Sequence, residues 1–271
     1  MALNTLARVS VRAGGLSTYL HCDAVAGMLP NSDVHCLGDA GLFLDHPSVT
    51  GASPYRRDMR YMFDMASLAP RRTAHRGCLC PVYMPQWPRA CRCHVFFPRR
   101  ALRAARAQMN SSGGVNQECL NSKAADLQWM CMFASYSLPH IRTPLFVSNS
   151  RFDSWQMDEI LGGQAYYGLN AAEQAAYASC VADYNRCDAR FKAAVDEWAV
   201  AFQGKLAPAL ANPKDGVFVN NCHRHHNVDG DEAFRTKING TSLVDAVALW
   251  AIEGKPPKLV DSAVPGQNPS C

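Results

Sequence analysis

The sequence contains no hydrophobic run long enough to cross a membrane. A transmembrane helix needs about 18 or more consecutive apolar residues, and no stretch of the 271 residues approaches that length. The first residues carry no acid before Asp23 and lack the apolar core of a secretory signal, while a transit peptide is only weakly indicated. We therefore expect no membrane span. The length allows one large domain or two small ones, and either can bury a sizeable core.

Acidic residues are absent between Asp64 and Glu118, and lysine is absent between Arg71 and Arg106, where nine arginines lie. The formal net charge of +4 is therefore a local property, and the remainder of the chain is acidic. We expect no nucleic-acid partner. Residues 66–108 are rich in Arg, Pro and Cys without helical or strand periodicity. Such a composition cannot offset its ordering entropy by burial, so we interpret it as a disordered insertion or translated non-coding sequence that protease cuts first.

Sequence patterns for metal binding are incomplete. The motifs "CLC" and "CRC" at residues 78–93 place one residue between paired cysteines, whereas zinc ribbons favour two to four. The histidines around His225 fall near Asp229, but Asn227 and Val228 stand where a metallo-hydrolase motif requires Asp and His. We predict neither a metal nor another cofactor. A zinc knuckle, or a cation on these histidines, is the alternative.

The remaining eight cysteines are scattered and even in number, which favours a disulfide framework in an oxidising compartment. Two glycosylation sequons, at Asn110 and Asn239, agree with secretion. Cys180 and Cys187 are expected to pair across the bend between two predicted helices. The eight are Cys22, Cys36, Cys119, Cys131, Cys180, Cys187, Cys222 and Cys271.

Hydrophobic periodicity predicts alternating strands and helices, which indicates α/β layering. Asn170 and Glu173 are spaced as a capping box at the start of one helix. The predicted strands are residues 9–11, 33–45 (a short strand ending in a loop), 143–150 and 216–221, and the predicted helices lie within 16–30, 170–187, 188–210 and 241–254.

Three features have the order of a hydrolase triad. A glycine-rich turn at residues 12–15 joins a strand to a helix, Asp153 follows a buried strand, and His225 follows the next strand. In such sites histidine takes the proton of a nucleophile, while the acid orients the imidazole and stabilises its cation. We expect the strands 143–150 and 216–221 to be parallel and adjacent, which brings the two side chains within about 2.6–3.2 Å.

The segments "AGGLSTYLHCD", "CLGDAGLFLD", "FDSWQ" and "VNNCHRHH" resemble the pectin acetylesterase family, whose animal relatives are the Notum carboxylesterases. The resemblance covers residues 13–65 and 109–262. It implies an extracellular serine esterase of α/β-hydrolase type acting on acetylated, pectin-like cell-wall polysaccharide. It also implies that Asp153 is the triad acid, His225 the base, and the backbone N–H of Ala13 part of the oxyanion hole.

Arg12 occupies the position at which the family carries its nucleophilic serine. Arginine stays protonated at physiological pH and cannot attack an ester, so we expect no hydrolysis by this chain, and Arg12 is suited to pair with Asp153. The alternatives to an esterase are a non-catalytic relative that binds glycan or lipid, or a truncated or mis-spliced gene model.

The family also has a region upstream of the turn, so we expect an incomplete α/β-hydrolase core without its N-terminal strands. The predicted organisation is residues 1–65 with the turn, 66–108 as the insertion, and 109–271 with the acid and histidine loops. Asp39 and Trp155 are candidate substrate contacts, with turn capping and core packing as their alternatives. We expect a monomer.

Overall fold

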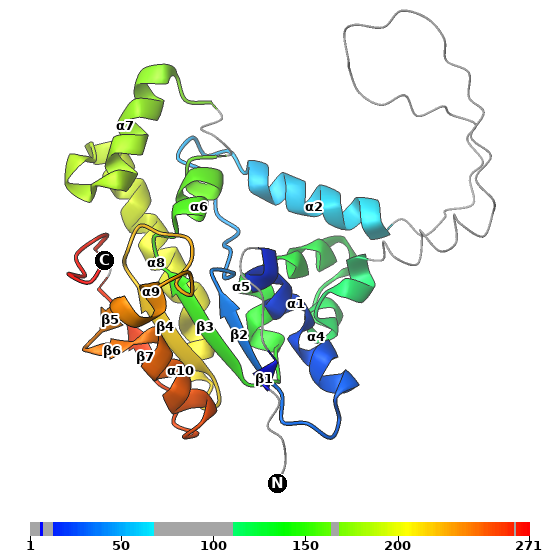
Figure 1. The fold of residues 1–271 in the computed structure, drawn as a ribbon. Coiled ribbons are helices and arrows are strands. Elements are labelled where there is room, and N and C mark those ends of the chain that lie inside the picture. The colour runs from blue at the N-terminus through cyan, green and yellow to red at the C-terminus, as the bar shows by residue number, and fades with distance from the viewer. Residues whose placement is uncertain (1–5, 8–12, 68–110, 164–167, 263) are drawn as a thin grey trace, which may run out of the picture.

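The computed structural model describes residues 6–7, 13–67, 111–163, 168–262 and 264–271. Its centre is a five-stranded sheet in the order β1-β2-β3-β4-β7, in which every pairing is parallel (Figure 1). The prediction of an α/β fold with the strands near 143–150 and 216–221 parallel and adjacent is confirmed. The strands are β1 (Leu6–Ala7), β2 (His35–Asp39), β3 (Leu145–Ser150), β4 (Gly216–Asn220) and β7 (Lys258–Val260).

The two central strands are covered on both faces, which explains their continuous apolar sequences. Every residue of β3 and β4 is buried. Val147 and Val217 are register partners and contribute to the core beneath one face. Phe146 and Phe218 alternate with them and contribute to the core beneath the other face.

One long helix and one short helix cover the two faces of the sheet. Helix α8 (Ala189–Ala211) packs Trp198 and Phe202 into one core, and helix α10 (Leu243–Ala251) packs Trp250 against Phe146 in the other. In Figure 1, α8 lies behind the strands and α10 in front of them. None of the helices in the described part of the chain is long and apolar enough to cross a membrane.

Shorter elements complete the fold. The predicted capping box is present, because Asn170 accepts the Glu173 backbone N–H and Glu173 accepts the Asn170 N–H. The further α-helices are α1 (Ala13–Met28), α2 (Pro54–Ser67), α4 (Gln117–Asn121), α5 (Ala134–Ser137), α6 (Ser154–Gln156), α7 (Ala171–Ala182) and α9 (Glu232–Arg235). A hairpin is formed by β5 (Lys237–Ile238) and β6 (Thr241–Ser242). Short 3₁₀ helices span Ser111–Gly114, Ala125–Met132, Leu138–His140 and Tyr184–Arg186, and a π-helical turn spans Met157–Leu161.

Several predicted boundaries differ from the structure. Strand β1 precedes the predicted strand at 9–11, and residues 8–12 lie outside the described part. Helix α1 already begins at Ala13, so Gly14 and Gly15 of the predicted glycine-rich turn lie in the first turn of the helix. Helix α2 runs across the predicted boundary at 65/66. Strand β7 was not predicted, because Lys258–Val260 is short, partly exposed and preceded by two prolines.

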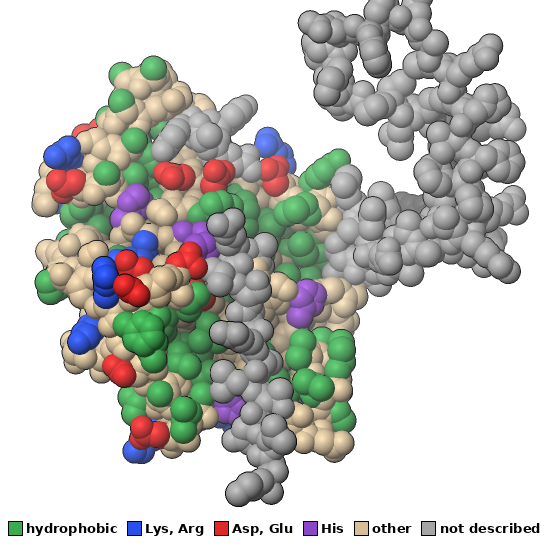
Figure 2. All heavy atoms as spheres, viewed as in Figure 1, with side chains coloured by type: hydrophobic (Ala, Val, Ile, Leu, Met, Phe, Trp, Pro, Cys, Tyr) green, Lys and Arg blue, Asp and Glu red, His purple; other side chains and the backbone are tan. Residues whose placement is uncertain are grey.

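The surface is mixed in character. Figure 2 shows acidic, basic and histidine side chains side by side over the region of α9, with hydrophobic side chains below them over α10. Most of the predicted insertion at 66–108, including its four cysteines, lies outside the described residues.

Candidate active site

Asp153 is placed by the end of β3 and the start of α6. It is the N-cap residue of α6 and accepts the backbone N–H of Gln156 at 3.0 Å. An aspartate is favoured at this position because its carboxylate satisfies an N–H that has no partner within the helix. The side chain is 0% exposed. A fully buried carboxylate is costly unless it is paired.

That pairing comes from His225. The loop after β4 brings its Nδ1 to 2.8 Å from Asp153 Oδ2 and 2.9 Å from Oδ1. The imidazole is 21% exposed, so one part of the ring remains open to solvent. Because Nδ1 faces the carboxylate, Nε2 is the nitrogen that remains to exchange a proton with another group.

Burial and hydrogen bonding shift the pKa of Asp153 in opposite directions. Burial raises the pKa of Asp153, whereas the hydrogen bond and charge of His225 and the Gln156 N–H act to lower it. The burial effect is the larger, so the pKa is raised overall. A buried carboxylate that is paired with an imidazole and also accepts backbone N–H groups is suited to orient a histidine and to stabilise its cation.

The third position of the predicted triad, Arg12, lies outside the described residues. Ala13 directly follows it and is the first residue of α1. Its backbone N–H belongs to the first turn of the helix, where N–H groups lack intrahelical acceptors and the helix dipole favours negative charge.

Asp39 lies at the end of β2 and is buried rather than on the open surface. Its side chain is 3% exposed. Its carboxylate accepts the Ser148 hydroxyl at 2.6 Å and the Asn227 N–H at 3.2 Å. Burial raises the pKa of Asp39 to about 6, while the hydrogen bonds from Ser148, Asn227 and Val228 act in the opposite direction.

Aromatic rings surround the exposed imidazole. Phe43 lies nearly parallel to the His225 ring, with 6.3 Å between centroids, and Trp155 lies at 6.1 Å. Phe43 and Trp155 contact each other at 4.8 Å, and Tyr55 meets both edge-on. Trp155 is only partly buried and packs against the core, so its ring contributes both to packing and to the surroundings of the pair.

The histidine cluster does not converge on a metal site. Among the described residues, no group of three or more His, Cys, Asp or Glu side chains is arranged to hold an ion. His226 packs against the His225 ring at 4.0 Å. Burial lowers the pKa of His223.

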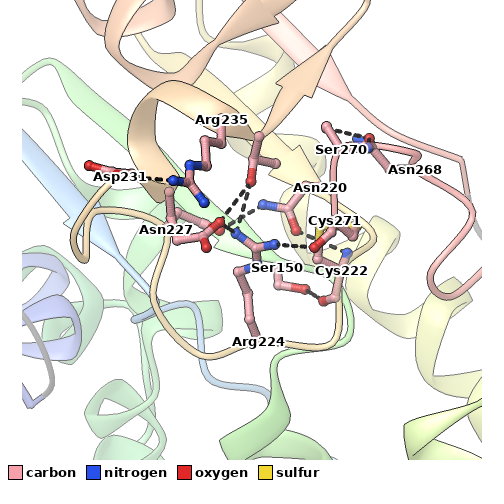
Figure 3. A network of polar contacts seen from close by, with 12 residues as sticks. Ser150, Asn220, Cys222, Arg224, Asn227, Asp231, Arg235, Asn268, Ser270 and Cys271 are labelled. Carbon is pink, nitrogen blue, oxygen red and sulfur yellow. Dashed lines mark hydrogen bonds and ion pairs between the residues drawn. A yellow bond between two sulfur atoms is a disulfide. The ribbon is translucent and has the colours of Figure 1, made fainter.

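The eight predicted framework cysteines form four disulfides, including the predicted Cys180–Cys187. The last of them lies close to the site, because Cys222–Cys271 joins the histidine loop to the C-terminal segment (Figure 3). Arg224, next to His225, contacts the same segment through the Cys271 carbonyl at 3.1 Å. The other pairs are Cys22–Cys36 and Cys119–Cys131.

The two sequons differ in what the structure describes. Asn110 lies outside the described residues. Asn239 is exposed at the two-residue turn between β5 and β6, where it has φ 51° and Gly240 has φ 81°. Positive φ at both residues is the turn that an Asn-Gly pair favours in a hairpin.

Sequence reasoning missed the polar support of the site. Asn227 is 1% exposed, and its amide bridges Asn220 at 2.7 Å and Ser148 at 3.2 Å (Figure 3 shows the Asn220 side). Gln156 accepts the Leu44 N–H at 3.2 Å. The sequence does carry a sign of these buried polar side chains, because Asn and Ser are frequent at the ends of otherwise apolar strands, as in "FVSNS" and "FVNN".

A parallel sheet with an aspartate–histidine pair on the loops after two neighbouring strands is an arrangement found in the α/β-hydrolase class. The fold agrees with crystal structures of the Wnt deacylase Notum from Drosophila. One crystal form matches with a TM-score of 0.60 and 18% identity over 96% of this chain and 56% of that chain. A second gives a TM-score of 0.56 and 17% identity over 96% and 57%.

The chain belongs to the Pectinacetylesterase family, whose sequence model matches residues 9–271. Among curated relatives, pectin acetylesterases 7 and 11 of Arabidopsis thaliana are 24% and 25% identical to it, each over 96% of this chain and 54% of the relative. The chain thus spans about half the length of the curated relatives that it matches.

Proposed function

We propose that this chain carries the acid–base half of a pectin acetylesterase-type ester hydrolase, and that it does not turn over esters as it stands. Asp153 is assigned as the acid and His225 as the base, with Arg12 at the nucleophile position. The Ala13 N–H is assigned to the oxyanion hole. The single observation that carries the proposal is the 2.8 Å contact between His225 Nδ1 and the buried Asp153 carboxylate.

The chemistry follows from which nitrogen is engaged. With Nδ1–H donated to Asp153, Nε2 is the atom that would accept the proton of a hydroxyl at residue 12, and the buried carboxylate would stabilise the resulting imidazolium. A serine at residue 12 would be activated in this way. A guanidinium offers no nucleophile.

The proposed substrate class is acetylated, pectin-like polysaccharide in the cell wall. The named activity of the pectin acetylesterase relatives supports it. The rings of Phe43 and Trp155 beside His225 supply apolar faces of the kind on which a sugar ring stacks. Four disulfides support secretion into an oxidising compartment, in which Asn239 is a candidate glycosylation site.

The test places a thiol at the nucleophile position. In Arg12→Cys, His225 should promote formation of the thiolate, which is the form that reacts with iodoacetamide. Peptide mass spectrometry measures the rate of alkylation at residue 12. This rate should fall about tenfold when His225→Gln is added. Ser17→Cys, on the exposed side of α1, is the matched control and should not respond to His225→Gln. Equal rates with and without His225 would contradict the assignment of residue 12.

The unmodified chain should hydrolyse neither p-nitrophenyl acetate nor acetylated pectin above a protein blank. Loss of a triad nucleophile removes most of the rate enhancement, by a factor on the order of a million. Hydrolysis that disappears in His225→Ala would overturn the proposed inactivity, and the search for another nucleophile would start at Ser10.

The aromatic surroundings favour a second candidate, a relative that binds glycan without cleaving it. Calorimetry with acetylated oligogalacturonides would then show binding by the unmodified chain that Trp155→Ala abolishes. Absence of binding in the unmodified chain removes this candidate.

A further inference from the structure

The end of β2 and the loop that follows it, residues 39–44, contact all three segments that carry the proposed site. The first contact is with α1. A Cβ added to Gly15 would lie 2.0 Å from the Asp39 carbonyl oxygen, and one added to Gly41 would lie 2.2 Å from the Gly15 carbonyl carbon. The backbones of the loop and of the first turn of α1 therefore touch directly, which fixes the start of the helix against the loop.

The second contact is with the acid segment. Asn149 Oδ1 accepts the Leu42 N–H at 3.1 Å, and Gln156 Oε1 accepts the Leu44 N–H at 3.2 Å. Leu42 and Leu44 are 0% and 1% exposed. The intervening Phe43 lies against His225 instead.

The third contact is with the histidine loop, and Asp39 makes it. Its carboxylate receives the backbone N–H of Asn227, two residues beyond His225. The Asn227 side chain is held at the same time by Ser148 of β3 and Asn220 of β4. Buried Asn227 is thus hydrogen-bonded to residues of three adjacent strands, β2, β3 and β4. Asp39 is the only one of these three partners that carries a charge.

We propose that Asp39 is a positioning residue of the site, whose carboxylate fixes the His225 loop through the Asn227 N–H and so keeps the imidazole on Asp153. The proposal rests on the assignment of His225 as the base. It goes beyond that assignment by giving a role to a buried carboxylate that interacts with Asp153 only through charge, since the nearby Asp153 acts with burial to raise the pKa of Asp39. Its consequence is that His225 leaves Asp153 when Asp39 loses its acceptor oxygens.

Asp215 provides a matched control within the same chain. It is 4% exposed, accepts a backbone N–H from Leu145 at 3.0 Å, and burial raises its pKa to about 6, as for Asp39. It precedes β4, at the opposite end of the sheet from His225. Asp39→Ala and Asp215→Ala therefore each remove a buried carboxylate that accepts a backbone N–H, at opposite ends of the sheet. Their charged neighbours differ, because Asp39 lies near Asp153 and Asp215 near Lys258 and Lys214.

The measurement is solvent exchange of the His225 Nδ1 proton, followed by NMR in the histidine-labelled 271-residue chain and assigned with His225→Gln. In Asp39→Ala the exchange rate should rise about tenfold or more, because a charged acceptor of a buried N–H is lost. In Asp215→Ala it should stay unchanged, although urea unfolding should show both variants destabilised.

A purely structural role for Asp39 predicts that both variants lose stability and neither alters the His225 signal. That result overturns the proposal, as does an equal rise in both variants. If the alanine variants do not fold, Asp39→Asn and Asp215→Asn are compared by the same measurement. The exchange rate of the His225 Nδ1 proton should then rise about threefold in Asp39→Asn alone, because a neutral acceptor is weaker than a carboxylate. The readout needs no turnover, so a failed alkylation or esterase test counts against the proposed function without deciding this one.

Discussion

Two buried aspartates whose raised pKa has a definite value, Asp39 and Asp215, predict an unusual pH dependence of stability, and the pKa of buried Asp153 is raised as well. In the folded chain burial raises the pKa of Asp39 and of Asp215 from 3.8 to about 6. The folded state therefore binds these protons more tightly than the unfolded state. A raised pKa contributes stability that is fully present below the unfolded pKa of about 4 and is lost as pH rises through about 6.

The magnitude follows from the two pKa values. The full difference between 3.8 and about 6 for Asp39 corresponds to roughly 3 kcal/mol of unfolding free energy. Between about pH 7 and pH 5 the contribution of one such group is about 1.4 kcal/mol. Asp39→Asn should abolish it, because an amide does not titrate.

Three histidines act in the opposite sense. Burial lowers the pKa of His21, His140 and His223, so acidification below the unfolded pKa costs stability at each. The decisive quantity is therefore the difference between Asp39→Asn and the unmodified chain, measured by urea unfolding of the oxidised protein from about pH 7 to about pH 5. The destabilisation caused by the variant should grow by about 1.4 kcal/mol as pH falls. A difference that is constant with pH, or that shrinks on acidification, refutes the reasoning.

Three further predictions concern packing, helix ends and modification. Gly15→Ala should lower the free energy of unfolding by about 3 kcal/mol, because the added Cβ would collide with backbone atoms. Gly27 has nothing within 4 Å of an added Cβ, so Gly27→Ala should raise the free energy of unfolding by about 0.5–1 kcal/mol. Chemical unfolding measures both, and equal effects would be inconsistent with the close approach at Gly15. Lys258→Met should lower the free energy of unfolding by about 2–3 kcal/mol, because the ammonium donates hydrogen bonds to the backbone carbonyls of Ala209, Asn212 and Asp215. Lys255 is exposed, so Lys255→Met should change the free energy of unfolding by less than about 0.5 kcal/mol. Secretion from a eukaryotic host should give one glycan at Asn239, detected by peptide mass and absent in Asn239→Gln; an unmodified Asn239 in secreted material would argue against the sequon.

The sequence predicted the parts of the fold whose causes are local. Strands β3 and β4 are apolar runs because both faces are buried, and Asp153 and His225 stand directly beyond them. Parallel strands end at one edge, so this order alone brings the two side chains together. The contact between them nevertheless joins residues 72 positions apart.

The parts that could not be predicted depend on long-range partners. Asp39 and Asn227 are 188 residues apart, and nothing in either neighbourhood specifies the other. Four disulfides among eight cysteines allow 105 connectivities, so only the sequence-local pair Cys180–Cys187 was predictable. Turn capping was the expected alternative for Asp39, because the local sequence does not reveal the strands on either side of it.

The proposed site has two parts that rest on different grounds. The histidine loop is held by contacts from β2, β3 and β4 through Asp39, Ser148 and Asn220, whereas residue 12 lies outside the described residues. The proposed loss of turnover rests on the arginine at residue 12 and not on a change in the base. For this reason a silent esterase assay and an intact His225–Asp153 hydrogen bond are compatible in this chain, and the thiol at residue 12 tests the base where an ester substrate does not.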